Sequence, residues 1–304
     1  MSKSKQFAAF VLAVTAATTL FAESRCPGNI VSLPFHLVNR HQIVVSVSVN
    51  HSGPYNFLLD TGTQFTMVDS SLAAKLLLTP SGKAAVAGYG INEAASLARL
   101  DLIEVGPQRI ASLEVVLFNL QKLQSSGLDV KGILGEDFLE HFDMLIDNAH
   151  NQLCLDNSAA MQAQVKGEHI ALLTSDQKRG ESDLPKSLVV AAHFTNGMRI
   201  VRLKLDSGAN AGFLYDPSSY LAVGSVRLAS VRGAGVDGQA RSFSVLPPQD
   251  LRIGALELTK APFYTITGVE RDPSTTEFDG LLPMGLFRRI FIDHAEHFAV
   301  LEPW

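Results

Sequence analysis

Positive charge is in short supply in this chain, and so are several familiar catalytic signatures. The 304 residues carry a net charge of −5, which excludes the basic footprint of a nucleic-acid-binding protein. Neither a G-x-S-x-G elbow nor an H-E-x-x-H motif occurs, so the sequence contains no signature of a nucleophile-elbow hydrolase or of a typical zinc peptidase. Beyond the N-terminus no apolar run is long enough to cross a bilayer, and we expect no stable membrane insertion.

The N-terminus itself has the pattern of a secretory signal peptide. Lys3 and Lys5 precede an apolar run over residues 7–21 that only threonines interrupt, and the small residue Ala22 follows. The run is too short and wrongly flanked for a permanent membrane span. We therefore interpret residues 1–22 as a signal peptide and expect a periplasmic or secreted protein.

Cysteine is scarce as well, since Cys26 and Cys154 are the only two. An exported chain reaches an oxidising compartment, where two thiols can pair. A bridge would tie the mature N-terminus to the strand expected over residues 152–155. Two unpaired thiols are the alternative, because connectivity does not establish geometry. Lipidation is disfavoured because Glu23-Ser-Arg lacks small apolar residues, and neither cysteine has a histidine partner for catalysis in any motif.

One short motif is present twice. The segment Phe57-Leu-Leu-Asp60-Thr61-Gly62-Thr63 in the first half matches Leu203-Lys-Leu-Asp206-Ser207-Gly208-Ala209 in the second. A random chain of this length would contain roughly 0.1 such Asp-Thr/Ser-Gly tripeptides, so two copies at the ends of apolar strands indicate an internal repeat. The repeat places one carboxylate in each half.

The sequence around the two motifs repeats too. Each aspartate ends the second strand of an expected hairpin, over residues 42–59 and 187–205. Each is followed by an apolar stretch, an N-capping aspartate and a short helix. The capping residues are Asp69 and Asp216. The separation is 146 residues both for Asp60 and Asp206 and for a second pair, Asp147 and Asp293.

Two carboxylates held close together have a chemistry that one carboxylate lacks. They cannot both ionise comfortably, so one proton is shared and the pair contains one acid and one base. Such a pair can take a proton from a bound water while donating one to a carbonyl oxygen, which hydrolyses an amide without a metal or a covalent intermediate. We therefore predict Asp60 and Asp206 as the catalytic pair and expect no cofactor. The residues expected to support the pair are Thr61, Gly62, Thr63, Ser207 and Gly208.

These residues resemble the aspartic peptidases, and more closely a two-lobed, single-chain bacterial retropepsin-like type than pepsin itself. The resemblance covers nearly everything after about residue 30. It implies a mainly β fold of two homologous β-barrel-like lobes, with short helices and an active-site cleft between the lobes. It also implies that an apolar segment braces each catalytic loop from behind. The bracing residues are Ile133, Leu134 and Gly135 in the first lobe and Leu281 and Leu282 in the second.

The second lobe departs from this pattern in two places. Pro283 stands where the resemblance predicts the bracing glycine, with Gly285 two residues on as a candidate for relieving the change. Ala209 stands where pepsin-like lobes carry a hydroxyl, whereas Thr63 keeps that hydroxyl in the first lobe. Because a hydroxyl donor favours the charged form of its carboxylate, the shared proton should reside mainly on Asp206.

A glycine-rich hairpin lies between each aspartate and its bracing segment. The flap candidates are Gly88, Tyr89 and Gly90 in the first half, with Tyr89 as the substrate-contacting residue, and Gly233 and Gly235 in the second. An ordinary surface hairpin is the alternative, and for the second hairpin it is equally favoured. That hairpin also spells G-x-G-x-x-G, but strand-like residues 241–245 follow where a dinucleotide-binding helix would begin.

The chain is thus expected to contain two lobes joined by a polar connection. A hydrophobic content of 46% is enough for two cores of ordinary domain size. The stretch between the lobes is rich in Gln, Lys, Glu, Asp and Ser, which is typical of a solvated linker. The predicted boundaries are 23–156 for the first lobe, 157–186 for the linker and 187–304 for the second lobe.

Three functional hypotheses follow. The leading one is an exported aspartic endopeptidase that acts as a monomer on a peptide or protein substrate. The alternative is a catalytically weak or inactive relative that binds extended peptides in the same cleft, favoured only by Pro283 and Ala209. The third is a zinc-dependent hydrolase, because residues 293–297, Asp-His-Ala-Glu-His, hold potential ligands. Without a distant ligand cluster, a polar turn in the terminal hairpin is the preferred interpretation, and we predict no metal site.

Overall fold

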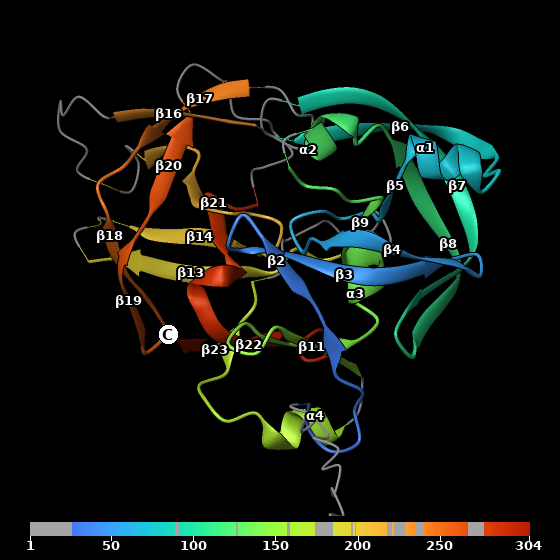
Figure 1. Cartoon of the computed structure of the whole chain (residues 1–304). Coiled ribbons are helices and arrows are strands. Elements are labelled where there is room, and N and C mark those ends of the chain that lie inside the picture. Colours follow the sequence, from blue (N-terminus) through green and yellow to red (C-terminus); the bar gives the residue numbers. More distant parts are fainter. Residues whose placement is uncertain are drawn as a thin grey trace, which may run out of the picture.

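The computed structural model of the chain describes residues 26–88, 91–125, 127–156, 159–173, 185–195, 197, 199–217, 221, 229–234, 240–266 and 277–304. The expected signal peptide and the flap candidates Tyr89, Gly90 and Gly235 lie outside these residues, as does most of the helix expected after Asp216. Within them the architecture is mainly β, as predicted, with three sheets and short helices (Figure 1). The helices are α1 (Ser70–Lys75), α2 (Gln121–Ser125), α3 (Glu136–Leu139), α4 (Ala159–Gln164) and the 3-10 helix η3 (Met284–Leu286).

The first half of the chain forms an eight-stranded sheet, on the right in Figure 1, with the order β2-β3-β4-β9-β5-β8-β7-β6. Alternation of side chains drives its formation: Ile43, Val45, Val47 and Val49 of β3 all point into the core. The strands are β2 (His36–Val38), β3 (Gln42–Val49), β4 (Ser52–Leu59), β5 (Met67–Asp69), β6 (Pro80–Gly88), β7 (Ile91–Val105), β8 (Gln108–Phe118) and β9 (Gly132–Leu134). As predicted, Asp69 caps α1, accepting a hydrogen bond from the Ser71 N–H.

The second half forms a nine-stranded sheet on the left in Figure 1, with the order β16-β17-β20-β15-β21-β14-β13-β18-β19. Its central strands repeat those of the first lobe, because β14 pairs with β13 antiparallel and with β21 parallel, just as β4 pairs with β3 and β9. The strands are β13 (Val189–Phe194), β14 (Ile200–Asp206), β15 (Gly212–Leu214), β16 (Ala229–Ala234), β17 (Ala240–Val245), β18 (Gln249–Ile253), β19 (Leu256–Ala261), β20 (Phe263–Ile266) and β21 (Gly280–Pro283).

A third sheet of six strands is built by both halves of the chain, in the order β1-β11-β10-β22-β23-β12. The two halves meet where β10 pairs with β22, and Ile146 lies opposite Ile290. The strands are β1 (Leu33–Pro34), β10 (Asp143–Asp147), β11 (Gln152–Asp156), β12 (Ile170–Ala171), β22 (Phe287–Asp293) and β23 (Phe298–Pro303). The sheet lies below the other two in Figure 1 and makes the lobes one continuous structure.

Part of the predicted linker, residues 157–186, forms secondary structure that joins this shared sheet. Helix α4 and strand β12 both fall in that range, and β12 pairs with β23. The reason is a few apolar side chains within a polar composition: Met161, Ile170 and Leu172 are all buried. The most polar stretch, residues 174–184, lies outside the described residues.

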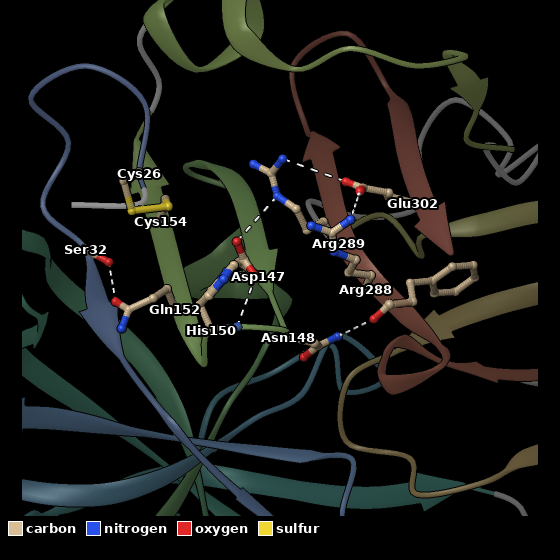
Figure 2. A network of polar contacts seen from close by, with 11 residues as sticks. Cys26, Ser32, Asp147, Asn148, His150, Gln152, Cys154, Arg288, Arg289 and Glu302 are labelled. Atoms are coloured by element: carbon tan, nitrogen blue, oxygen red, sulfur yellow. Dashed lines mark hydrogen bonds and ion pairs between the residues drawn. A yellow bond between two sulfur atoms is a disulfide. The ribbon is translucent and has the colours of Figure 1, made fainter. Parts of the chain in front are cut away.

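A disulfide joins Cys26 to Cys154, as Figure 2 shows. Both cysteines are buried in a small apolar cluster with Met161 of α4 and Phe291 of β22. The bridge therefore fastens the start of the described chain to β11 of the shared sheet. Of the two alternatives for the cysteines, a disulfide or two free thiols, the structure contains the disulfide.

Polar contacts reinforce the junction of the two halves (Figure 2). Asp147 at the end of β10 lies 3.5 Å from the Arg289 guanidinium of β22, which also lies 3.7 Å from Glu302. The neighbouring Asn148 donates to the carbonyl of Phe287 at 2.9 Å. The repeated residues Asp147 and Asp293 thus end the two strands that meet at the interface.

Candidate active site

The two repeated aspartates lie at the same place in their lobes. Asp60 directly follows β4 and Asp206 is the last residue of β14, and each of these strands is flanked by the hairpin partner and the bracing strand. Asp206 is buried, whereas Asp60 is half-buried. The loops that follow them meet between the two lobes.

Thr61 and Ser207 lock the two loops together. The Thr61 N–H donates to Ser207 Oγ at 3.1 Å, and the Ser207 N–H donates to Thr61 Oγ1 at 3.0 Å. Each hydroxyl then donates across the interface to the carbonyl before the other aspartate: Thr61 to Leu205 at 2.9 Å and Ser207 to Leu59 at 2.8 Å. These four bonds are buried, so both loops are fixed relative to each other.

Gly62 and Gly208 each let the carboxylate of the opposite lobe approach closely. A Cβ atom added to Gly62 would lie 2.5 Å from Oδ2 of Asp206, and one added to Gly208 would lie 2.5 Å from Cγ of Asp60. Each glycine therefore packs against the carboxylate of the opposite lobe, and no larger residue fits without moving the pair. The structure brings together all seven residues that the sequence assigns to the dyad and its support.

The hydrogen bonds to the two carboxylates are not equivalent. Asp60 accepts from the Gly62 N–H and from the Thr63 hydroxyl, both at 2.8 Å, and each of its oxygens has one donor. Asp206 accepts from the N–H groups of Gly208 and Ala209 at 2.8 and 2.9 Å, both on Oδ1. Among these contacts only the first lobe supplies a side-chain hydroxyl.

This asymmetry agrees with the electrostatics of the pair. Burial and the neighbouring charge of Asp60 raise the pKa of Asp206 from 3.8 to about 7, against the opposing influence of Lys204 and the two backbone N–H donors. Asp206 is the more buried of the two and lacks the hydroxyl donor, so it is the member that keeps the shared proton. At mildly acidic pH the pair then holds one acid and one base.

The predicted bracing segments lie directly behind the catalytic loops. In the first lobe β9 places Leu134 opposite Leu59, and the Leu134 carbonyl accepts the Asp60 N–H at 3.0 Å. Gly135 is needed there, because an added Cβ would lie 2.6 Å from the Phe65 backbone. The loop is held further by Asp137, which accepts both the N–H and the hydroxyl of Thr66.

In the second lobe Pro283 is accommodated in the bracing strand. Strand β21 extends to Pro283, which pairs with Asp206 in parallel register, while Leu282 pairs with Leu205. Gly285 does not take over the bracing position; an added Cβ there would lie 2.4 Å from Nδ1 of His41 in the first lobe. The departure from the expected pattern thus leaves the second brace in place.

Both expected flaps are hairpins where the chain is described. Gly88 of β6 pairs with Ile91 of β7, and Gly233 of β16 pairs with Arg241 of β17. The tips of both hairpins, with Tyr89, Gly90 and Gly235, lie outside the described residues, so their relation to the dyad stays a prediction. In the second hairpin a strand, β17, follows the G-x-G-x-x-G sequence, as expected.

The histidine-containing sequence near the C-terminus forms the turn between β22 and β23, as predicted. Among the described residues no group of three or more His, Cys, Asp or Glu side chains is arranged to hold a metal ion. His294 instead bonds Glu136 at 3.2 Å and the Phe142 carbonyl at 2.6 Å. No helix in the described part of the chain is long and apolar enough to span a membrane.

Two residues at the site were not predicted. Gln42, the first residue of β3, donates through Nε2 to the Gly208 carbonyl at 2.9 Å, and Lys204 of β14 donates through Nζ to the Gly62 carbonyl at 2.8 Å. Both contacts cross from one lobe to the other. Lys204 stands two residues before Asp206 in the second motif, and that proximity was the only available signal.

Residues 45–138 match a family model described as aspartyl protease. The matched range contains Asp60, the loop residues Thr61, Gly62 and Thr63, and the Gly135 brace, so this part of the chain is similar to the aspartyl protease family. The second lobe lies outside the matched range. No curated protein matches the sequence.

Proposed function

We propose that the protein is an exported aspartic endopeptidase that hydrolyses peptide bonds with a water held between Asp60 and Asp206. The observation that carries this proposal is the close approach of the two catalytic loops, in which each carboxylate packs against the glycine of the opposite loop. The crossed Thr61 and Ser207 bonds hold that placement before substrate arrives, which is what acid–base catalysis by a pair requires.

The asymmetry of the pair assigns the roles. Asp60, charged and held by Thr63, takes a proton from the water as its oxygen attacks the substrate carbonyl carbon. Asp206 gives its proton to the carbonyl oxygen, and a tetrahedral diol results. Asp60 then donates its proton to the amide nitrogen, Asp206 recovers a proton from a diol hydroxyl, and the C–N bond breaks. Both groups return to their starting states.

Export is supported by the sequence pattern of residues 1–22 and by the disulfide between Cys26 and Cys154, which persists in oxidising compartments. We also propose that a monomer is sufficient, since one chain supplies both aspartates and the shared sheet that joins them. Specific activity should then stay constant on dilution. A steep fall in step with dissociation in light scattering would contradict this.

The test is incubation of the mature chain with a peptide library between about pH 3 and pH 8, with cleavage read by mass spectrometry. Asp60→Asn and Asp206→Asn should each lower kcat/KM by at least about 10²–10⁴-fold with an unchanged circular dichroism spectrum. Asp101→Asn, on an exposed position of β7, is the matched control and should be fully active. Chelators should have no effect.

Each outcome has a defined meaning. Turnover that survives either Asn substitution at the dyad would refute the two-carboxylate mechanism. A folded wild-type chain that binds peptides and cleaves none of them would favour the inactive relative. The intact second brace at Pro283 and the two backbone donors to Asp206 remove much of the support for that alternative.

A further inference from the structure

Lys204 is a buried cation beside the dyad. Its exposed fraction is 3%, and it lies on β14 two residues before Asp206. Its counterpart in the first lobe, 146 residues earlier, is Leu58, an apolar residue in a hydrophobic cluster. The fold thus accepts an apolar side chain at this position, so the lysine is not a requirement of the strand.

The surroundings of Lys204 compensate little of the cost of burying a charge. The neighbouring strands place Val189 and Leu281 opposite it, and neither can ionise. Its ammonium lies 5.3 Å from the centre of the Phe278 ring and donates to the Gly62 carbonyl at 2.8 Å. A buried ammonium with neutral partners of this kind is expensive, which indicates a use beyond packing.

The Gly62 contact has a neutral mirror image in the other lobe. Gln42 donates to the Gly208 carbonyl at 2.9 Å, so the glycine carbonyl of each catalytic motif accepts a hydrogen bond from a side chain of the opposite lobe. Only one of these two side chains carries a charge. The hydrogen bond alone therefore does not require a lysine, since an amide makes the matching bond.

The charges around Lys204 show where its influence is directed. Asp206 and Asp60 are the acids of the dyad, and Lys204 favours the ionised form of Asp206, against burial and the charge of Asp60. The other cation of this strand near the dyad, Arg202, is bound by Asp279, which directly precedes β21, at 3.1 and 3.2 Å. The Lys204 ammonium thus acts on Asp206 of the pair.

We propose, building on the proposed function, that Lys204 is a positioning residue for the dyad: it anchors the Gly62 loop across the lobe interface, and its charge stabilises the singly charged state of the carboxylate pair. The cation makes it easier for the pair to lose its first proton, so the active form persists to lower pH. The enzyme is in this way adapted to a more acidic medium than the same pair with an apolar residue in place of Lys204 would tolerate.

The test compares Lys204→Gln, Lys204→Met and Lys204→Arg. The two neutral variants should move both limbs of the kcat/KM profile to higher pH by about one unit, because an opposite charge near a carboxyl shifts its pKa by that order. The Gln variant keeps a donor for the Gly62 carbonyl, so it should fold even if Lys204→Met does not. Lys204→Arg keeps the positive charge, so both limbs should stay at their wild-type pH. Lys166→Met, an exposed lysine, is the control and should change nothing.

Gln42→Met separates anchoring from charge. It removes the neutral mirror bond and should lower kcat/KM without moving either limb. If Lys204→Gln and Lys204→Met also lower activity evenly at every pH, Lys204 is merely structural and the proposal is overturned.

A readout without substrate keeps this result independent of the proposed function. The carboxyl carbon of Asp206, labelled with ¹³C and followed by NMR, should titrate at higher pH in Lys204→Gln than in the wild type. If the wild type cleaves no peptide, the proposed function fails while this titration still decides the role of Lys204. An unchanged titration in a folded variant would overturn the proposal even in an active enzyme.

Discussion

His294 and Glu136 form a buried pair between the two halves of the chain, with His294 Nε2 3.2 Å from Glu136 Oε2. Glu136 is the first residue of α3, directly after the Gly135 brace, and His294 follows β22 of the shared sheet. The bond to Glu136 and its charge raise the pKa of His294, outweighing burial, the largest single influence, which lowers it. The pair thus connects the support of the catalytic loop to the far lobe and is strongest while the histidine is charged.

The pH dependence of stability follows from this pair and from the buried carboxyl groups. Burial, partly offset by the Thr66 donors, raises the pKa of Asp137 to about 6, and burial together with Asp293 raises that of Asp143 to about 6. A group whose pKa is higher in the folded state contributes stability below its unfolded pKa and loses it as the pH rises through the folded value. His294, Asp137, Asp143 and Asp206 all have this sign.

We therefore predict that the Tm falls as the pH rises from about 4 to about 7. Differential scanning calorimetry across this range measures it. Asp143→Asn should flatten the fall, whereas Asp101→Asn, at an exposed site, should leave it unchanged. A Tm that increases steadily toward neutral pH would show that these groups are ionised in the folded protein at lower pH than their burial indicates.

The crossed hydroxyls give a prediction on stability and activity together. In Thr61→Val the Ser207 N–H loses its buried acceptor, and the expected cost is about 1–3 kcal/mol in the free energy of unfolding. Activity should fall as well, because the two loops lose their alignment. Urea unfolding and kcat/KM on the same samples measure both effects.

The control for this pair of residues is Ser71→Ala on α1, which removes a hydroxyl remote from the dyad. It should leave kcat/KM unchanged. If Thr61→Val unfolds at the wild-type urea concentration, the four crossed bonds do not hold the lobes together as described.

The disulfide should matter for stability and not for chemistry. The double variant Cys26→Ser with Cys154→Ser opens a large loop, and the expected loss is about 2–5 kcal/mol in the free energy of unfolding. Below its lowered Tm the variant should keep the kcat/KM of the wild type, because the dyad is built by other strands. A pH profile that moves in the variant would show that the bridge positions the dyad.

The catalytic pair was predictable because its signal is local and repeated. Asp60 and Asp206 stand in short motifs at strand ends, and the strands and turns around them can be predicted from residues that are close in the sequence. The shared sheet was not predictable in the same way, since β10 and β22 pair across about half the chain. Strand β12 was missed because its short apolar run, residues 170–173, is flanked on both sides by polar residues.

Lys204 shows how a correct strand prediction can still conceal a functional residue. Leu203-Lys204-Leu205 alternates like a strand with one wet face, which would place the lysine in solvent. In the fold, β14 is a central strand covered on both faces, so every side chain from Leu203 to Asp206 is buried. Which faces of a strand are covered depends on the elements that pack on either side of the sheet, and the sequence of the strand does not contain that information.

The third residue after each aspartate gives the last prediction. The Thr63 hydroxyl donates to Oδ2 of Asp60 at 2.8 Å, whereas Ala209 offers Asp206 only its backbone N–H. Removing the hydroxyl in Thr63→Ala makes the charged form of Asp60 less favourable, and the acid limb of kcat/KM should move to higher pH. Adding one in Ala209→Ser makes the charged form of Asp206 more favourable. Both limbs should then move to lower pH, with the alkaline limb moving further because Asp206 is the last to lose its proton.

The two substitutions thus act on different members of one coupled pair, and the double variant separates them. Thr63→Ala with Ala209→Ser moves the hydroxyl donor from Asp60 to Asp206, while Asp206 stays the more buried of the two. The proton affinities of the two carboxyls then become more alike, so the shared proton should move toward Asp60 and the two limbs of the profile should lie closer together. Full pH profiles of kcat/KM for the wild type, the single variants and the double variant measure this. Gln64→Ala, next to Thr63 and without a bond to either carboxylate among the described contacts, is the control for local disturbance. If the profiles of all active variants coincide, the side chains at positions 63 and 209 do not govern which carboxylate holds the proton, and burial of Asp206 alone sets the asymmetry.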